Sequence, residues 1–298
     1  MTYHTLLGFQ KDPFSTSPDP EFFYLTREHD IALTNILIEL RLKRGLTVIF
    51  GDIGTGKTTL SRKLVQELRQ RGDMIFHMIL NPSFETEGQF LTSLVRNFDI
   101  NLPDSANLSM ANIIDLQDAM QKFLIQKSVD EKKTIILIVD EAQKLNMTTL
   151  EILRVLLNFE TNEYKLIQLV LLGQLELYQK IFSMPNFLDR ISFQYTLNPL
   201  GPEETKEMIK FRIAQAGYNS SMELFAPEAI SEIYNYSRGY PRSITLLCHR
   251  VLKELIMQNK NIVSRDIVCS VIEKEKTAGW DRAQVLQKMP YYKAHEIS

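Results

Sequence analysis

The residues best suited to chemistry form a glycine-rich segment, GDIGTGKT, from Gly51 to Thr58. It matches the pattern GxxxxGK[ST], follows the β-branched run LTVIF and precedes a helical pattern. Glycines let backbone N–H groups converge on phosphate oxygens, and a helix start adds the positive end of its dipole. The segment therefore predicts a nucleotide phosphate site rather than a chance glycine turn.

Two side chains of this site have expected roles. Lys57 would bridge the β- and γ-phosphates of ATP, and the Thr58 hydroxyl would ligate Mg²⁺. The predicted nucleotide-binding residues are Gly51, Asp52, Ile53, Gly54, Thr55, Gly56, Lys57, Thr58, Thr59 and, from farther along the chain, Arg242.

Two acids follow a buried apolar run in ILIVDEAQKL, which places Asp140 and Glu141 at the carboxyl edge of a strand. Ligands of parallel sheets bind at that edge. Asp140 would hold Mg²⁺, through water, and Glu141 would accept or orient the proton of an attacking water. Glu141 favours hydrolysis over a switch that only binds. The alternative is that one of the two acids merely caps the next helix.

Two further polar residues could complete hydrolysis. Gln174 follows the apolar run LIQLVLLG and could orient the same water, or it could simply begin a helix. Arg190 precedes a fifth strand and could place a cation on the γ-phosphate bound by a neighbouring subunit. The alternative for Arg190 is a surface pair with Asp189 or another acid.

Arg242 stands at an unusual place in SRGYPRSITLLCHR. Pro241 suits a first helical turn, so Arg242 lies where the helix dipole is already positive. A facing anion would compensate the charge, and the nucleotide phosphates are the expected partner. The alternative is a local acid such as Glu204 or Glu232.

Strand and helix patterns alternate through the first two thirds of the chain. Strands are expected near 46–50, 74–80, 134–141, 165–173 and 192–197. A helix is expected at 28–43, with Ile31, Asn35, Ile38 and Leu42 spaced along its buried face. This alternation predicts an α/β fold, a three-layer sandwich around a central parallel five-stranded sheet.

After NPLGPEE only helical patterns follow, which predicts a small all-helical lid domain. The expected parts are an N-terminal segment at 1–27, a P-loop domain at 28–199, the lid at 200–275 and a tail at 276–298. Formal net charge is -2, so the whole chain carries no nucleic-acid signature. No segment approaches the roughly 20 apolar residues that a membrane span needs.

These motifs, in this order, resemble the AAA+ ATPase superfamily. Gly51–Thr58 resembles its Walker A, Asp140–Glu141 its Walker B, and Gln174 its sensor 1. Arg190 resembles its arginine finger, and Arg242 its sensor 2.

The chain is more similar still to ExeA/GspA-like ATPases of general secretion and of related pilus or exopolysaccharide loci. The similarity covers about residues 3 to 273. The segments that carry it are LLGFQKDPFSTSPDPEFFYLTREHDIAL, LNPSF, VDEAQKL, LLGQLELYQKI, LNPLGPEET and GYPRSITLLCHRVL. Leu175 departs from the GQPEL pattern of that family.

The resemblance implies an N-terminal segment on the adenine side of the nucleotide, with Phe14, Tyr24 and His29 as candidate wall residues. Plain core packing is the alternative for all three. It also implies an ATP-hydrolysing homo-oligomer, a ring or filament, that assembles or energises an envelope machine through a protein partner. We expect a cytoplasmic protein that reaches the inner membrane through partners.

Two other functions stay open at this point. TnsC-like transposition ATPases share the same core, so a DNA-binding ATPase with a transposase as partner is one. The local basic stretches RLKR (41–44) and RKLVQELRQR (62–71) motivate it, although an amphipathic, solvated helix face is the favoured explanation of them. The other is a nucleotide-gated interaction module whose hydrolysis is incidental.

Overall fold

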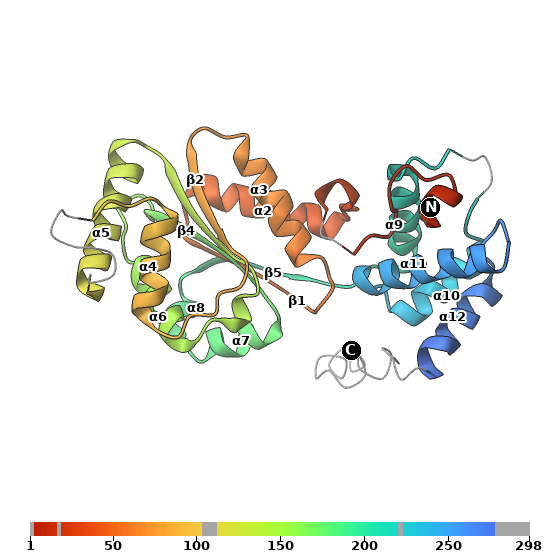
Figure 1. The fold of residues 1–298 in the computed structure, drawn as a ribbon. Coiled ribbons are helices and arrows are strands. Elements are labelled where there is room, and N and C mark those ends of the chain that lie inside the picture. Colours follow the sequence, from red (N-terminus) through yellow and green to blue (C-terminus); the bar gives the residue numbers. More distant parts are fainter. Residues whose placement is uncertain (1–2, 17–18, 103–111, 220–222, 278–298) are drawn as a thin grey trace. The chain divides into compact units, whose positions relative to one another are not determined.

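The computed structural model describes residues 3–16, 19–102, 112–219 and 223–277 (Figure 1). The chain divides into two compact units. The sheet unit is Leu25–Asn198, and the helical unit combines Met1–Tyr24 with Pro199–Ser298. The expected tail at 276–298 lies almost wholly outside the described residues.

One parallel sheet forms the centre of the sheet unit, and this confirms the predicted fold class. Its strand order is β2-β3-β4-β1-β5, so β1 lies inside the sheet and β5 at an edge. The strands are β1 Leu46–Gly51, β2 Met74–Ile79, β3 Thr134–Val139, β4 Ile167–Gly173 and β5 Ile191–Leu197. All pairs are parallel, so all carboxyl ends, including those of β1, β3 and β4, meet at one edge.

Helices cover both faces of this sheet (Figure 1). On one face lie α2 Arg27–Leu42 and α3 Lys57–Arg69. On the other lie α4 Glu87–Asn97, α5 Ile113–Ile125, α6 Met147–Leu156, α7 Leu175–Phe182 and α8 Pro185–Leu188. A short π-helical turn, η2 Gln126–Asp130, continues α5, and a 3₁₀ turn, η3 Ala142–Lys144, follows β3.

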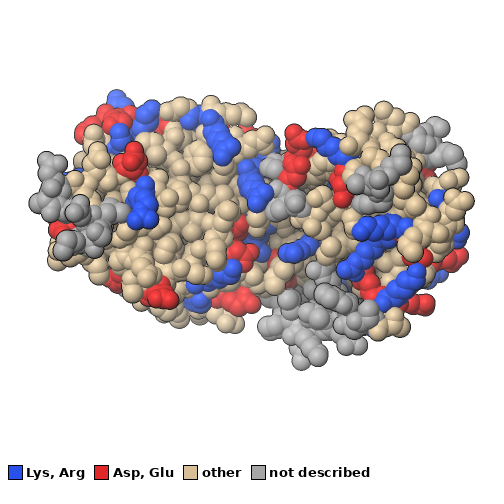
Figure 2. All heavy atoms as spheres, viewed as in Figure 1, with Lys and Arg blue, Asp and Glu red and all other residues tan. Residues whose placement is uncertain are grey.

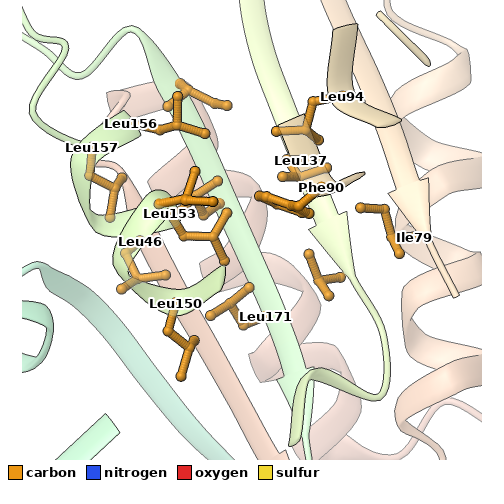
Figure 3. Packing of buried hydrophobic residues seen from close by; sticks show 14 of the residues in the cluster. Leu46, Ile79, Phe90, Leu94, Leu137, Leu150, Leu153, Leu156, Leu157 and Leu171 are labelled. Atoms are coloured by element: carbon orange, nitrogen blue, oxygen red, sulfur yellow. The ribbon is translucent and has the colours of Figure 1, made fainter. Parts of the chain in front are cut away.

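The core between the sheet and α4 to α8 is built from large apolar side chains. Leu46, Leu137 and Leu171 point from three neighbouring strands toward Phe90 and Leu153 (Figure 3). All five are fully buried. The strands β1, β3 and β4 have no exposed residue, which is why they appear in the sequence as continuous apolar runs rather than alternating ones.

The expected apolar face of α2 is wrong. Ile31, Ile38 and Leu42 are 37%, 43% and 51% exposed. The buried stripe is the adjacent one, Ala32, Leu33, Ile36 and Leu40. Because α2 is apolar on more than one side, its periodicity allowed either stripe, and contact with β1 and β5 decides between them.

In the helical unit, α1 Tyr3–Leu6 and η1 Pro20–Phe22 come from the N-terminal segment. The rest are α9 Pro202–Gln215, α10 Pro227–Ser237, α11 Pro241–Met257 and α12 Arg265–Thr277. The buried Arg212 side chain of α9 holds the N-terminal segment: it donates to the carbonyls of Pro13 at 2.8 Å and Ser15 at 2.9 Å. The described residues of this segment, 3–16 and 19–24, therefore pack with the helical unit.

Gly239 lies between α10 and α11 in a conformation that only glycine tolerates. Its φ is +76°, and a Cβ there would lie 2.0 Å from the Leu200 carbonyl oxygen. The Gly239 carbonyl also accepts a hydrogen bond from the Leu200 N–H at 2.9 Å. The close approach of these two backbones therefore fixes the start of α11.

Gly239→Ala should destabilise the helical unit by about 2–5 kcal/mol, since it adds backbone strain and a backbone clash. The measurement is the urea midpoint followed by circular dichroism. Gly201→Ala is the matched control, because a Cβ there would only touch Glu204 Oε2 at 3.9 Å. Equal midpoints for the two variants would contradict the packing described here.

Candidate nucleotide-binding site

The glycine-rich loop leads from β1 directly into α3. Gly56 is the N-cap of α3 with φ +102°, a left-handed conformation that favours glycine. No side chain caps α3, and no acidic residue lies in its first turn. The first amides of the helix therefore lack an intrahelical partner and a side-chain cap, an arrangement suited to an anion.

Lys57 is a buried cation at the start of α3. It is 5% exposed, and its Nζ donates to the carbonyls of Gly51 at 2.7 Å and Asp52 at 2.8 Å. Burial lowers the pKa of Lys57, while the charges of Glu141 and Asp140 oppose that shift. A cation in this environment gains from an anionic ligand, since its two hydrogen bonds go to neutral carbonyls.

Asp140 lies next to this loop at the carboxyl end of β3. It is 1% exposed, its carboxylate accepts a hydrogen bond from the Thr58 hydroxyl, and its Oδ1 accepts one from the Glu141 N–H at 2.9 Å. Burial raises the pKa of the Asp140 carboxyl, and both hydrogen bonds oppose that change. Thr58 and Asp140, whose Mg²⁺ roles were predicted separately from the sequence, are therefore in contact in the structure.

The donor set fits Mg²⁺. A hydroxyl and a carboxylate are the oxygen ligands that Mg²⁺ takes from proteins when phosphates and water complete its shell. Over the described ranges, no group of three or more His, Cys, Asp or Glu side chains forms a metal cage. The Thr58 hydroxyl and the Asp140 carboxylate suit an Mg²⁺ ion that nucleotide phosphates also hold.

Glu141 has a constrained backbone and a held side chain. Its φ of 53° is left-handed, an arrangement that costs a non-glycine residue about 1–3 kcal/mol. Its Oε2 accepts a hydrogen bond from Gln143 Nε2 at 2.7 Å. Glu141 does not cap η3 with its side chain, so the capping alternative fails for this residue.

Gln174 is brought to the same edge of the sheet. It is the N-cap residue of α7, directly after β4, and its N–H donates to Gln143 Oε1 at 3.0 Å. Its side chain makes no capping hydrogen bond. Its proposed contact with a water stays a prediction.

Arg190 lies at the amino ends of the strands, whereas the glycine-rich loop lies at their carboxyl ends. The next residue, Ile191, pairs with Leu46 at the start of β1, whereas the glycine-rich loop follows the end of β1. A strand of this length spans about 17 Å, so Arg190 is too distant to serve the nucleotide site of its own subunit. Among the described residues it forms no ion pair with Asp189; its charge contributes, after that of Lys165, to lowering the pKa of Glu160.

Arg242 lies on the first turn of α11, as predicted, and its side chain is exposed. The two acids considered as local partners are engaged elsewhere. Glu204 accepts from the Gly201 N–H at 3.1 Å, and Glu232 pairs with Arg265 at 3.2 Å. Within the described part of the chain, the Arg242 side chain makes no hydrogen bond or ion pair. Its contact with a nucleotide stays a prediction.

Of the candidate adenine-wall residues, His29 belongs to the sheet unit and lies beside the glycine-rich loop. It is 2% exposed, and its Nε2 lies 3.0 Å from the Thr55 carbonyl oxygen. Phe14 is a core residue of the helical unit, 1% exposed and edge-on to Phe225. Tyr24 donates its hydroxyl hydrogen bond to Glu207.

Sequence reasoning missed two residues that organise this site. Gln143 links Glu141 to Gln174, and Lys180 donates to the carbonyls of Gln143 at 2.5 Å and Leu145 at 2.8 Å. The only sequence signal was the polar pair Gln143–Lys144, which follows the two acids after one intervening residue, Ala142.

Comparison with known protein sequences gives a domain match and a similar relative. A sequence-family model described as an AAA domain matches residues 40–181. The chain is also 34% identical over 274 residues to general secretion pathway protein A of Aeromonas hydrophila. That match covers 91% of this chain and 48% of the relative, so the chain spans about half the length of the curated relative that it matches.

Solved structures share the fold at low sequence identity. The ORC2 protein of Aeropyrum pernix has a TM-score of 0.61 at 15% identity, covering 87% of this chain and 70% of that chain. Cdc6p of Pyrobaculum aerophilum has a TM-score of 0.60 at 16% identity, and the match covers 84% of this chain and 67% of that chain. The RuvB Holliday junction branch migration motor of Thermotoga maritima has a TM-score of 0.53 at 18% identity, and the match covers 82% of this chain and 68% of that chain. The AAA-domain match, together with the glycine-rich loop and the paired acids after β3, shows a P-loop domain of the AAA+ type at residues 40–181, and 91% of the chain is similar in sequence to general secretion pathway protein A.

Proposed function

We propose that this protein binds ATP with Mg²⁺ at the loop between β1 and α3 and hydrolyses it. Lys57 and the first amides of α3 bind the phosphates, while Thr58 and Asp140 hold the ion, which neutralises phosphate charge when bound. Glu141 accepts the proton of the attacking water, and Gln174 orients that water. The observation that carries the proposal is that Thr58 and Asp140 meet directly beside the buried Lys57.

The experiment that tests hydrolysis is phosphate release from Mg²⁺-ATP. Glu141→Gln should reduce the release while ATP binding is kept, because the substitution retains the shape of the side chain and removes its basic oxygen. Turnover equal to that of wild type would contradict the assigned base.

The position of Arg190 supports a nucleotide-dependent homo-oligomer. Because Arg190 is separated from its own glycine-rich loop by the length of β1, a γ-phosphate contact requires a second subunit. In a ring or filament, each nucleotide would receive Arg190 from the adjacent copy. Loss of the γ-phosphate would then weaken the contact between subunits.

Arg190→Ala should lower hydrolysis by about 1,000-fold or more and leave ATP binding largely intact, since the residue acts on transition-state charge in trans. Mixing it with Lys57→Ala subunits tests the trans assignment. A Lys57→Ala subunit lends its Arg190 to an intact nucleotide site of an Arg190→Ala neighbour, so mixtures should regain turnover. If no mixing ratio restores phosphate release, the intersubunit role of Arg190 is excluded.

Arg242 would act as a nucleotide sensor. Its charge lies at the positive end of α11 without an ionic partner in the described residues, which is unfavourable until an anion approaches. The nucleotide phosphates would supply that anion, and their loss after hydrolysis would release the helical unit. In this account, the helical unit is the lid.

The biological role that fits best is assembly or energising of a bacterial envelope machine for secretion, pilus formation or exopolysaccharide export. The support is similarity to general secretion pathway protein A over most of this chain. A protein partner of such a machine would be recruited in the cytoplasm or at the inner membrane. No helix in the described ranges is long and apolar enough to cross a bilayer.

The DNA-binding alternative gains little from the surface. Lysine and arginine side chains are interspersed with acidic ones over the face shown in Figure 2. In the two basic stretches, Lys43 lies over the Tyr164 ring at 4.3 Å and Lys63 pairs with Glu67 at 3.1 Å. A binding assay on duplex DNA at low salt, with and without ATP, tests this alternative, since phosphate contacts would make any affinity steeply salt-dependent.

A further inference from the structure

Gln143 forms hydrogen bonds to several polar residues at the carboxyl ends of the strands, beside the candidate site. Its Nε2 donates to Glu141 Oε2 at 2.7 Å, and its Oε1 accepts from the Gln174 N–H at 3.0 Å. Its backbone carbonyl accepts from Lys180 Nζ at 2.5 Å. The residue therefore connects the end of β3 with both ends of α7.

These partners determine the orientation of the Gln143 amide. If the amide were flipped, its oxygen would face the Glu141 carboxylate and its NH₂ would face the Gln174 N–H. Both contacts would then be repulsive, acceptor against acceptor and donor against donor. Because the Gln143 oxygen accepts the hydrogen bond from the Gln174 N–H, the Gln143 NH₂ group must face Glu141.

The geometry leaves one carboxylate oxygen of Glu141 available. Oε2 is engaged by Gln143, whereas Oε1 makes no hydrogen bond to the described residues. The backbone is held as well, since the Glu141 N–H donates to Asp140 Oδ1. A carboxylate with one oxygen tied and the backbone fixed presents its other oxygen in a narrow range of directions.

We infer that Gln143 is a positioning residue that aims the Glu141 carboxylate at the attacking water and links that aim to α7 through Gln174 and Lys180. This inference rests on the proposed hydrolysis. Gln143 itself touches neither nucleotide nor water in this account; it acts through Glu141.

Two variants separate the contact with Glu141 from the contact with α7. Gln143→Leu removes both. Gln143→Glu keeps an oxygen for the Gln174 N–H and replaces the donor facing Glu141 by an acceptor. Both should lower kcat by roughly 10- to 100-fold, because a misplaced catalytic group costs about that much. The KM for ATP and the equilibrium affinity for ATP should change by less than about twofold.

Gln258→Leu is the matched control. Gln258 Nε2 donates to Glu254 Oε1 at 2.9 Å, a similar Gln–Glu hydrogen bond in the helical unit. It should leave kcat unchanged. Thermal unfolding of all variants, followed by circular dichroism, checks that the fold is retained.

A double-mutant comparison decides whether Gln143 acts through Glu141. In single-turnover assays, Gln143→Leu added to Glu141→Gln should cause no further loss. The inference would be overturned if the losses caused by Gln143→Leu and Glu141→Gln were additive. It would also be overturned by a normal kcat in Gln143→Glu, or by faster turnover in either Gln143→Leu or Gln143→Glu. If Glu141→Gln itself matches wild type, the hydrolysis proposal fails; if only the Gln143 variants match wild type, this inference fails alone.

Discussion

Lys57→Ala should abolish ATP binding at working nucleotide concentrations. The side chain is a buried ammonium group whose present hydrogen bonds go to the Gly51 and Asp52 carbonyls, beside the uncapped start of α3. Charge-assisted hydrogen bonds to phosphate oxygens are worth about 1.5–3 kcal/mol each. Loss of two of them, about 3–6 kcal/mol, weakens affinity by roughly 100-fold or more.

Isothermal titration with ATP and Mg²⁺ measures this effect. Lys63→Ala, on the same helix but on its surface and paired with Glu67, is the control and should bind like wild type. Because Lys57 also tethers the loop, circular dichroism should confirm that the variant is folded. Unchanged ATP affinity in a folded Lys57→Ala protein would show that the nucleotide site lies elsewhere.

Glu141→Gln should lose about 100- to 10,000-fold in turnover, the range that general base catalysis contributes. ATP affinity should stay within a few-fold of wild type, since Thr58, Asp140 and Lys57 are untouched. The amide keeps the size of the side chain, so the left-handed backbone at this residue needs no rearrangement.

The variant should therefore accumulate the ATP-bound state. Size-exclusion chromatography with ATP should show a larger oligomer than the wild-type protein retains after hydrolysis. The control is the same variant without nucleotide, which should elute like nucleotide-free wild type. Elution that does not respond to ATP in either protein would contradict nucleotide-dependent assembly.

The nucleotide loop and the two acids could be predicted because their signals are local. Gly51–Thr58 and Asp140–Glu141 each lie directly after an apolar strand, and parallel strands bring their carboxyl ends together. Only the strand order of the sheet, in which β4 lies between β3 and β1, was needed to bring Lys57, Thr58 and Asp140 together.

Gln143 could not be predicted in the same way. Its partners Gln174 and Lys180 are 31 and 37 residues away, so the hydrogen bonds depend on how η3 packs against α7. The prediction of the buried face of α2 was wrong for a related reason, since packing against β1 and β5 buries Ile36 rather than Ile38. The buried position of Phe14 likewise depends on distant packing, because the buried Arg212 side chain donates hydrogen bonds to backbone carbonyls on either side of Phe14.

The central claim is that Glu141 activates water for ATP hydrolysis at the loop that contains Lys57. Its most direct measurement is single-turnover release of the γ-phosphate, with protein in excess over ATP and Mg²⁺ present, in wild type and Glu141→Gln at equal nucleotide occupancy. The account predicts release by wild type, at least about 100-fold slower release by Glu141→Gln, and loss of release on chelation of Mg²⁺. Equal release by the two proteins at equal occupancy, whether measurable or negligible, would contradict it.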